Sequence, residues 1–146
     1  AIALAHHAEL LLLDEATSGL DPVMRDDVLD LLLDFVQSEK HGVLFSTHIM
    51  SDLSKIADYI AFLHEGKLLF FKSKDELIYR YGLIHCGEKL FREIDHDDIL
   101  AWRKQEYEYQ ILVADRETAA RKYKDCVIDP ATLDSIMLLN IRGKKV

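Results

Sequence analysis

The chain has few of the residues that define several protein classes. Its 146 residues include only two cysteines, two prolines and one tryptophan. Cys86 and Cys126 lie far apart with no metal-type spacing, which excludes a disulfide framework and predicts free thiols in a reducing compartment. No apolar run approaches the roughly 20 residues that a transmembrane helix needs, so no direct insertion into a membrane is expected.

Positive charge is also scarce. Eighteen Lys and Arg residues stand against 26 Asp and Glu residues, which gives a formal net charge of −8. General binders of nucleic acid or of anionic membranes need the opposite sign, so no nucleic-acid partner is expected. The length suits one domain, or part of a domain with a small appendage.

A run of four leucines, Leu10–Leu13, ends in two acids, Asp14 and Glu15. The run predicts a buried strand, with both acids at its carboxyl end, where open α/β sheets hold ligands. Acidic side chains are rarely buried unless they are paired or bound to metal. Such a pair also occurs by chance, so its interpretation as a Mg²⁺-nucleotide site depends on the residues that follow.

Those residues predict a strand–helix–strand unit. Asp21 followed by Pro22 is typical of an N-cap with proline at the first helical position, and apolar residues recur at helical spacing between Val28 and Phe35. The short apolar segment Val43–Thr47 predicts a strand of a parallel sheet buried on both faces, with His48 at its carboxyl end. The unit would bring His48 to the edge of the sheet that holds the two acids.

These residues together resemble the motifs of ATP-binding-cassette (ABC) ATPases. Asp14–Glu15 resembles the Walker B motif, Ser18–Asp21 the D-loop, and His48 the switch histidine. The resemblance covers roughly residues 1–80, and Ser-Gly-Leu-Asp-Pro followed later by Ser-Thr-His is highly specific. Ala16 departs from the proline usual in the family, a change that alters loop rigidity and leaves the chemistry intact.

The resemblance implies a role for each matching residue, with ATP and Mg²⁺ as cofactors. Asp14 would hold Mg²⁺ through its water shell, and Glu15 would be the catalytic carboxylate that positions or deprotonates the attacking water. His48 would contact the γ-phosphate. The D-loop residues would run along a second ATPase subunit and couple the two ATP sites of the dimer: Ser18, Gly19, Leu20 and Asp21.

Other motifs of the family are missing from the sequence. It contains no Gly-x-x-x-x-Gly-Lys-Ser/Thr loop, no glutamine loop and no Leu-Ser-Gly-Gly-Gln-like signature, and residues 1–7 resemble the helix that follows that signature. We therefore expect an α/β fold: the C-terminal part of a P-loop (RecA-like) nucleotide-binding domain over residues 1–82, then a small α+β appendage over residues 83–146. Alone, the chain is expected to be inactive.

The implied function is that of the ATP-hydrolysing subunit of a transporter, most similar to an exporter. It would act as a dimer on a separate transmembrane permease, in the cytoplasm at the membrane face. One alternative is an ABC ATPase without a membrane partner, as in DNA repair or translation; those relatives usually carry Asn-His or Asn-Leu before the D-loop aspartate. The other is a non-enzymatic regulatory or protein-binding module at residues 83–146.

The remaining sequence predicts a series of short elements. A hairpin over 59–71 would turn at Glu65-Gly66, with Phe62, Phe70 and Phe71 in the core. A capping box at Ser73–Glu76 would open a helix that Gly82 ends. The later elements are a strand at 107–113 with Tyr107 and Tyr109 packed on one face, a helix at 116–123, a strand at 126–128 and a helix at 131–141.

Overall fold

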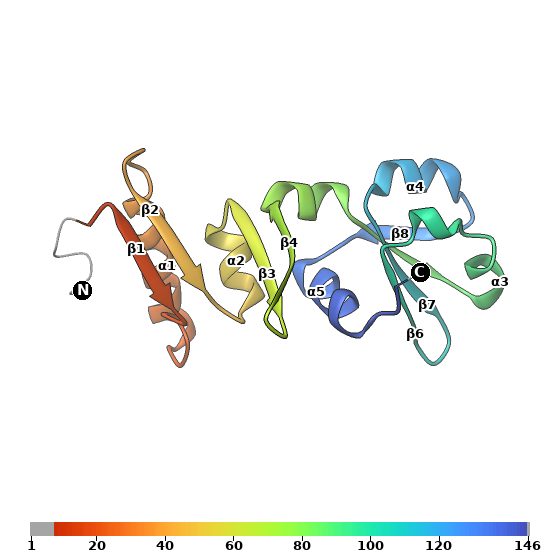
Figure 1. Ribbon diagram of the computed structural model, residues 1–146, viewed down its shortest axis with the longest axis horizontal. Coiled ribbons are helices and arrows are strands. Elements are labelled where there is room, and N and C mark those ends of the chain that lie inside the picture. Colours follow the sequence, from red (N-terminus) through yellow and green to blue (C-terminus); the bar gives the residue numbers. More distant parts are fainter. Residues whose placement is uncertain (1–7, 146) are drawn as a thin grey trace. The chain divides into compact units, whose positions relative to one another are not determined.

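The computed structural model describes residues 8–145 (Figure 1). The chain divides into two compact units, the first ending at Ala57 and the second beginning at Asp58. The first unit contains β1 (Leu10–Asp14), α1 (Pro22–Phe35), β2 (Gly42–Ser46) and α2 (Met50–Ile56). Within residues 8–145, no helix has the length and apolarity needed to cross a membrane.

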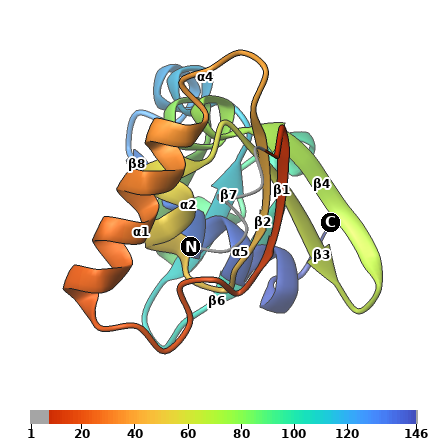
Figure 2. The same cartoon turned by 90° about the vertical axis from the view of Figure 1, so that its left-hand side faces the viewer.

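The first unit is the strand–helix–strand arrangement that the sequence predicted. β1 and β2 pair in parallel, with Leu11 opposite Val43 and Asp14 opposite Ser46. α1 lies alongside the two strands (Figure 2). The buried apolar side chains of this unit are Leu11 of β1 and Leu29 and Leu32 of α1. The two carboxyl ends therefore lie side by side, as parallel pairing requires.

The other face of these strands is exposed, contrary to the prediction of burial on both faces. Leu10, Leu12 and Leu44 keep 60%, 69% and 67% of their surface accessible. Successive side chains of a strand point to opposite faces, so a single helix buries only every second residue. Among the described residues, nothing covers this second apolar face.

The second unit begins with an antiparallel hairpin of β3 (Tyr59–His64) and β4 (Lys67–Ser73). Glu65 and Gly66 both have positive φ, 47° and 73°, the conformation of the two-residue turn that fits strand twist. The predicted hairpin is confirmed. Of its three phenylalanines, Phe62 and Phe70 are half-buried with ring centroids 5.4 Å apart, whereas Phe71 is 63% exposed and does not join the core.

The rest of the second unit is built on a four-stranded antiparallel sheet in the order β6-β7-β5-β8. Its centre is β5, which pairs with both β7 and β8 and contributes the fully buried Ile84. The elements are η2, a π-helix (Glu76–Arg80), β5 (Gly82–Cys86), α3 (Glu88–Phe91), η3, a 3-10 helix (His96–Asp98), β6 (Ala101–Lys104), β7 (Tyr109–Val113), α4 (Arg116–Lys122), β8 (Val127–Pro130) and α5 (Leu133–Arg142).

Two details of this unit differ from the sequence prediction. Tyr107 lies before β7 and is 88% exposed, so it does not pack in the appendage, whereas Tyr109 is buried. The Ser73 hydroxyl accepts a hydrogen bond from the Glu76 amide at 3.1 Å, which is one of the two bonds of the predicted capping box. Gly82 opens β5 directly.

The compact units divide the chain earlier than the boundary expected at residues 82/83. The hairpin and η2 both belong to the second unit. Leu77 of η2 is fully buried, and η2 contacts β4, β8 and α5. Burial of this side chain therefore ties the segment before residue 82 to the sheet that follows it, while the domain division at 82/83 stays a prediction.

Candidate functional site

Three sequence-predicted residues come together at the carboxyl ends of β1 and β2. Asp14 is the last residue of β1, and the hydroxyl of its register partner Ser46 donates a hydrogen bond to its Oδ1 atom. The backbone amide of Glu15 donates to the Ser46 carbonyl at 3.0 Å, which carries the pairing one residue past the strand. Both acids therefore contact Ser46, Asp14 through its carboxylate and Glu15 through its backbone amide, which also lies 3.2 Å from the Ser46 hydroxyl oxygen.

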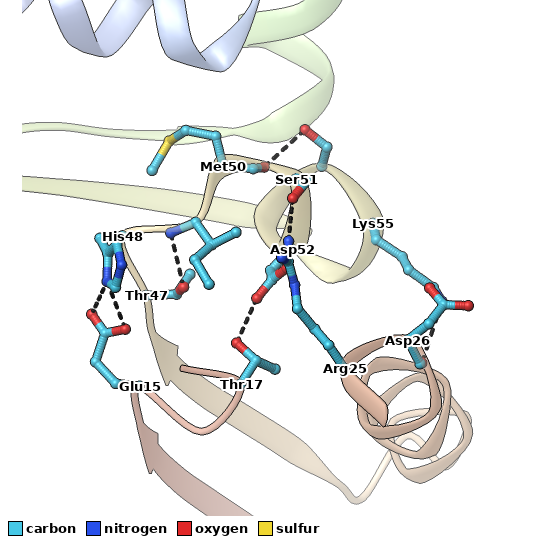
Figure 3. A network of polar contacts seen from close by, with 12 residues as sticks. Glu15, Thr17, Arg25, Asp26, Thr47, His48, Met50, Ser51, Asp52 and Lys55 are labelled. Atoms are coloured by element: carbon cyan, nitrogen blue, oxygen red, sulfur yellow. Dashed lines mark hydrogen bonds and ion pairs between the residues drawn. The ribbon is translucent and has the colours of Figure 1, made fainter. Parts of the chain in front are cut away.

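Glu15 faces His48, the residue two positions after the end of β2 (Figure 3). Nδ1 of His48 lies 2.9 and 2.8 Å from the two carboxylate oxygens of Glu15. An ionised carboxylate only accepts hydrogen bonds, so Nδ1 carries the proton in this contact. His48 is 72% exposed and Glu15 is 39% exposed, so both side chains can reach a ligand in solvent.

The backbone of Glu15 is left-handed, with φ of 48°. This conformation is uncommon for a residue with a side chain. It turns the chain sharply out of β1 while the Glu15 side chain meets His48. Gly19, with φ of 78°, is the second left-handed residue of the loop, and open space surrounds the position of a Cβ there.

The predicted D-loop residues lie in the exposed segment that joins β1 to α1. Asp21 caps α1, because its Oδ1 atom accepts hydrogen bonds from the amides of Val23 and Met24 at 3.0 and 3.1 Å. Pro22 occupies the first helical position, so the predicted cap is confirmed. Ser18, Gly19 and Leu20 are exposed. The backbone amide of Ser18 donates a hydrogen bond to the Glu15 carbonyl at 3.0 Å, so this segment begins directly beside the Glu15–His48 contact.

The oxygen-rich end of β1 fits a magnesium ion. Mg²⁺ prefers oxygen ligands and is typically held by one or two carboxylates together with substrate phosphates and water. Asp14 supplies an exposed carboxylate, already hydrogen-bonded to the Ser46 hydroxyl. Within residues 8–145, no cluster of three or more His, Cys, Asp or Glu residues could hold a metal by itself, so the remaining ligands would come from nucleotide and water.

Sequence reasoning missed four residues around this site. Ser46 could have been found, because it ends the strand that pairs with Asp14. The buried Thr17, in the loop after β1, and the partly buried Arg25 both donate hydrogen bonds to the buried Asp52. Asp52 lies in the first turn of α2, where acids are common, and nothing in the sequence marked it as buried.

Comparisons with known proteins agree with these motifs. The lantibiotic transport ATP-binding protein SrtF of Streptococcus pyogenes is 39% identical over 75 residues, which cover 51% of this chain and 32% of SrtF. The methionine import ATP-binding protein MetN 2 of Lactiplantibacillus plantarum is 46% identical over 67 residues, 46% of this chain and 20% of MetN 2. No protein-family model matches the chain.

A third relative extends the match through both units. The ABC transporter ATP-binding protein YtrB of Bacillus subtilis is 28% identical over 158 aligned residues, which cover 99% of this chain and 52% of YtrB. The homologues of this chain are therefore ATP-binding proteins of ABC transporters, as the motifs predicted. The chain spans between about a fifth and a half of the length of these three relatives.

Proposed function

We propose that this chain carries the metal- and water-handling part of the ATP hydrolysis site of an ABC transporter ATP-binding protein. The observation that carries the proposal is the contact between Glu15 and His48 at 2.8–2.9 Å, beside Asp14. These groups occupy the carboxyl ends of two neighbouring parallel strands. That is the position at which α/β sheets bind ligands.

Each side chain has a distinct task in hydrolysis. The Glu15 carboxylate accepts a hydrogen bond from the attacking water and orients it, and it can take the proton that the water loses. Asp14 would hold Mg²⁺, which would neutralise charge on the phosphate oxygens. The contact with Glu15 fixes the direction of the His48 ring.

The orientation of His48 decides how it can meet a phosphate. With Nδ1–H donated to Glu15, Nε2 is an acceptor in the neutral ring and a donor in the imidazolium. A phosphate oxygen needs a donor. His48 therefore binds the γ-phosphate either as the imidazolium or after its contact with Glu15 has broken, and the second route frees Glu15 for water.

The phosphate-gripping groups belong to other residues of the complete ATP-binding protein. The chain contains no Gly-x-x-x-x-Gly-Lys-Ser/Thr loop, whose backbone amides and lysine cradle the phosphates. The chain alone is therefore inactive and holds ATP weakly. The exposed segment Ser18–Asp21 contacts a second ATPase subunit, and the dimer drives a transmembrane permease from the cytoplasmic face of the membrane.

The transported substrate is left open by the relatives. SrtF is a lantibiotic transport protein and MetN 2 a methionine import protein by their names. The proposal is therefore ATP-driven transport, and it specifies neither import nor export. Export stays a prediction of the sequence. No observation favours the alternatives without a membrane partner.

Substitution of the catalytic carboxylate tests the proposal. In the complete ATP-binding protein, Glu15→Gln keeps the side-chain volume but removes the base, so ATP binding should persist while turnover falls by about 10²–10⁴-fold. Glu9→Gln is the matched control, because Glu9 is exposed and precedes β1. Turnover by Glu15→Gln equal to that of the control would contradict the assignment.

A further inference from the structure

Asp52 is a fully buried carboxylate near the site, with 0% of its surface exposed. Its Oδ2 atom accepts a hydrogen bond from the Thr17 hydroxyl at 2.6 Å, and its Oδ1 atom accepts one from Nε of Arg25, also at 2.6 Å (Figure 3). The terminal nitrogen Nη2 of Arg25 lies 2.5 Å from the same Oδ1 atom, and it also donates a hydrogen bond to the Ser51 hydroxyl. Both oxygens of Asp52 are therefore occupied.

These contacts join three segments that lie near Glu15 and His48 in the sequence. Thr17 lies two residues after Glu15, and Asp52 lies four residues after His48, in the first turn of α2. Arg25 is in the first turn of α1, and its backbone amide donates to the Asp21 carbonyl at 2.9 Å. One carboxylate thus holds the loop after β1, the start of α1 and the helix after the switch histidine.

The contacts of this network restrict the movement of the three segments. A buried charge is tolerated only when it is paired and hydrogen-bonded, so Asp52 and Arg25 keep each other in place. The Thr17 side chain is itself only 1% exposed, and its hydroxyl donates to a charged acceptor, which makes the bond short and directional. A displacement of Thr17 would move Glu15, two residues away, relative to His48.

We propose that Thr17 and Asp52 are positioning residues, which act on hydrolysis by fixing the Glu15–His48 geometry. The inference rests on the proposed function of that pair. Neither side chain contacts Glu15 or His48 through a hydrogen bond, so their effect passes through the backbone of the loop and of α2. The consequence is a slower chemical step with unchanged affinity for ATP.

The second link between the two helices offers a matched control. Lys55 of α2 forms ion pairs of 2.6 Å with both Asp26 and Asp30 of α1. Lys55→Met therefore removes a contact between the same two helices without touching the loop that carries Glu15. It should leave kcat and KM at their wild-type values.

The experiment compares Thr17→Val with Thr17→Ser in the complete ATP-binding protein. Thr17→Val has nearly the same shape but no donor, and its kcat should fall by about 10- to 100-fold with KM for ATP unchanged, because small displacements of catalytic groups cost rate. Thr17→Ser retains the hydroxyl and should recover most of the wild-type kcat. Thr17→Cys, with a much weaker donor, gives the same test if the valine variant does not fold, as judged by thermal melting.

The outcomes separate this inference from the proposed function. An active wild type in which Thr17→Val turns over as fast as Lys55→Met would overturn the inference alone. A loss in Thr17→Ser as large as that in Thr17→Val would also overturn it, because the hydroxyl would then not be the cause. A complete wild-type protein without ATPase activity would instead contradict the proposed function.

Discussion

Asp14 and Ser46 are register partners in neighbouring parallel strands, and the Ser46 hydroxyl donates a hydrogen bond to the Asp14 carboxylate. This hydrogen bond fixes the orientation of the Asp14 carboxylate. Partners that orient a metal ligand typically contribute about 10- to 100-fold to metal affinity. If Asp14 holds Mg²⁺, the Ser46 hydroxyl orients this ligand in the absence of the ion.

Ser46→Ala should therefore raise the Mg²⁺ concentration for half-maximal ATPase activity of the complete protein by about 10-fold. The maximal rate at saturating Mg²⁺ should change little, because Asp14 remains. Titration of activity with Mg²⁺ measures both quantities. Ser38→Ala, at an exposed position in the turn before β2, is the control, and an equal Mg²⁺ requirement in both variants would show that Ser46 does not support the ligand.

The two roles suggested for Asp21 can be separated by size and charge. Asp21→Ala removes the acceptor that caps α1 and should lower the free energy of unfolding by about 0.5–2 kcal/mol. Asp21→Asn retains a capping oxygen and should stay near wild-type stability. Urea unfolding measures this difference. A fall in the ATPase activity of the complete protein with Asp21→Asn, at unchanged stability, would then reveal the proposed contact with a second subunit.

Asp98 gives the second unit a pH-dependent contribution to stability. The Lys122 ammonium, 2.7 Å away, and the Tyr123 hydroxyl lower the pKa of the Asp98 carboxyl. A carboxyl with a lowered pKa in the folded state stabilises the fold above the unfolded-state pKa of about 3.9, and this contribution is lost as the pH falls through the folded value.

The unfolding free energy of Asp98→Asn should therefore fall below that of wild type at pH 7, with a difference that shrinks as the pH drops below about 4. Urea titrations at pH 7, 5 and 3 follow this difference. When Lys122→Met is also present in both proteins, the difference in unfolding free energy caused by Asp98→Asn should depend much less on pH. The main cause of the lowered pKa of Asp98 is then absent. A difference that stays constant from pH 7 to pH 3 would contradict the argument.

Cys86 should be almost inert to alkylation in the folded protein. Burial, with a smaller effect of the neighbouring Cys126, raises the pKa of its thiol to about 11. At pH 8 such a group is ionised in only about one molecule in a thousand, and the thiolate is the nucleophile. Labelling of Cys86 by iodoacetamide, followed by peptide mass spectrometry, should be at least about 100-fold slower than in urea; similar rates would show that Cys86 is accessible.

The sequence predicted the parallel pairing of β1 and β2 correctly because its signals are local. The run of leucines predicts a strand, and the acids after it mark its carboxyl end. Parallel pairing with the strand before His48 follows from the helix between the two strands. Asp21–Pro22 likewise sets the start of α1 from two adjacent residues. None of these inferences needs knowledge of a distant contact.

The missed features depend on distant contacts. The burial of Asp52 results from Thr17 and Arg25, 35 and 27 residues away. β5 was not predicted, because Gly82 was interpreted as the end of a helix and the short segment after it contains the polar His85. Its place at the centre of the sheet comes from pairing with β7 and β8, which no local pattern encodes.

The backbone of Glu15 is left-handed, with φ of 48°. At this residue the side chain proposed for catalysis lowers the stability of the fold. A side chain in this conformation costs roughly 1–2 kcal/mol, which glycine would avoid. A screen of random variants for heat resistance alone would therefore favour Glu15→Gly, the replacement that deletes the proposed catalytic carboxylate. Any attempt to make this protein more robust by directed evolution needs a selection for turnover at every round.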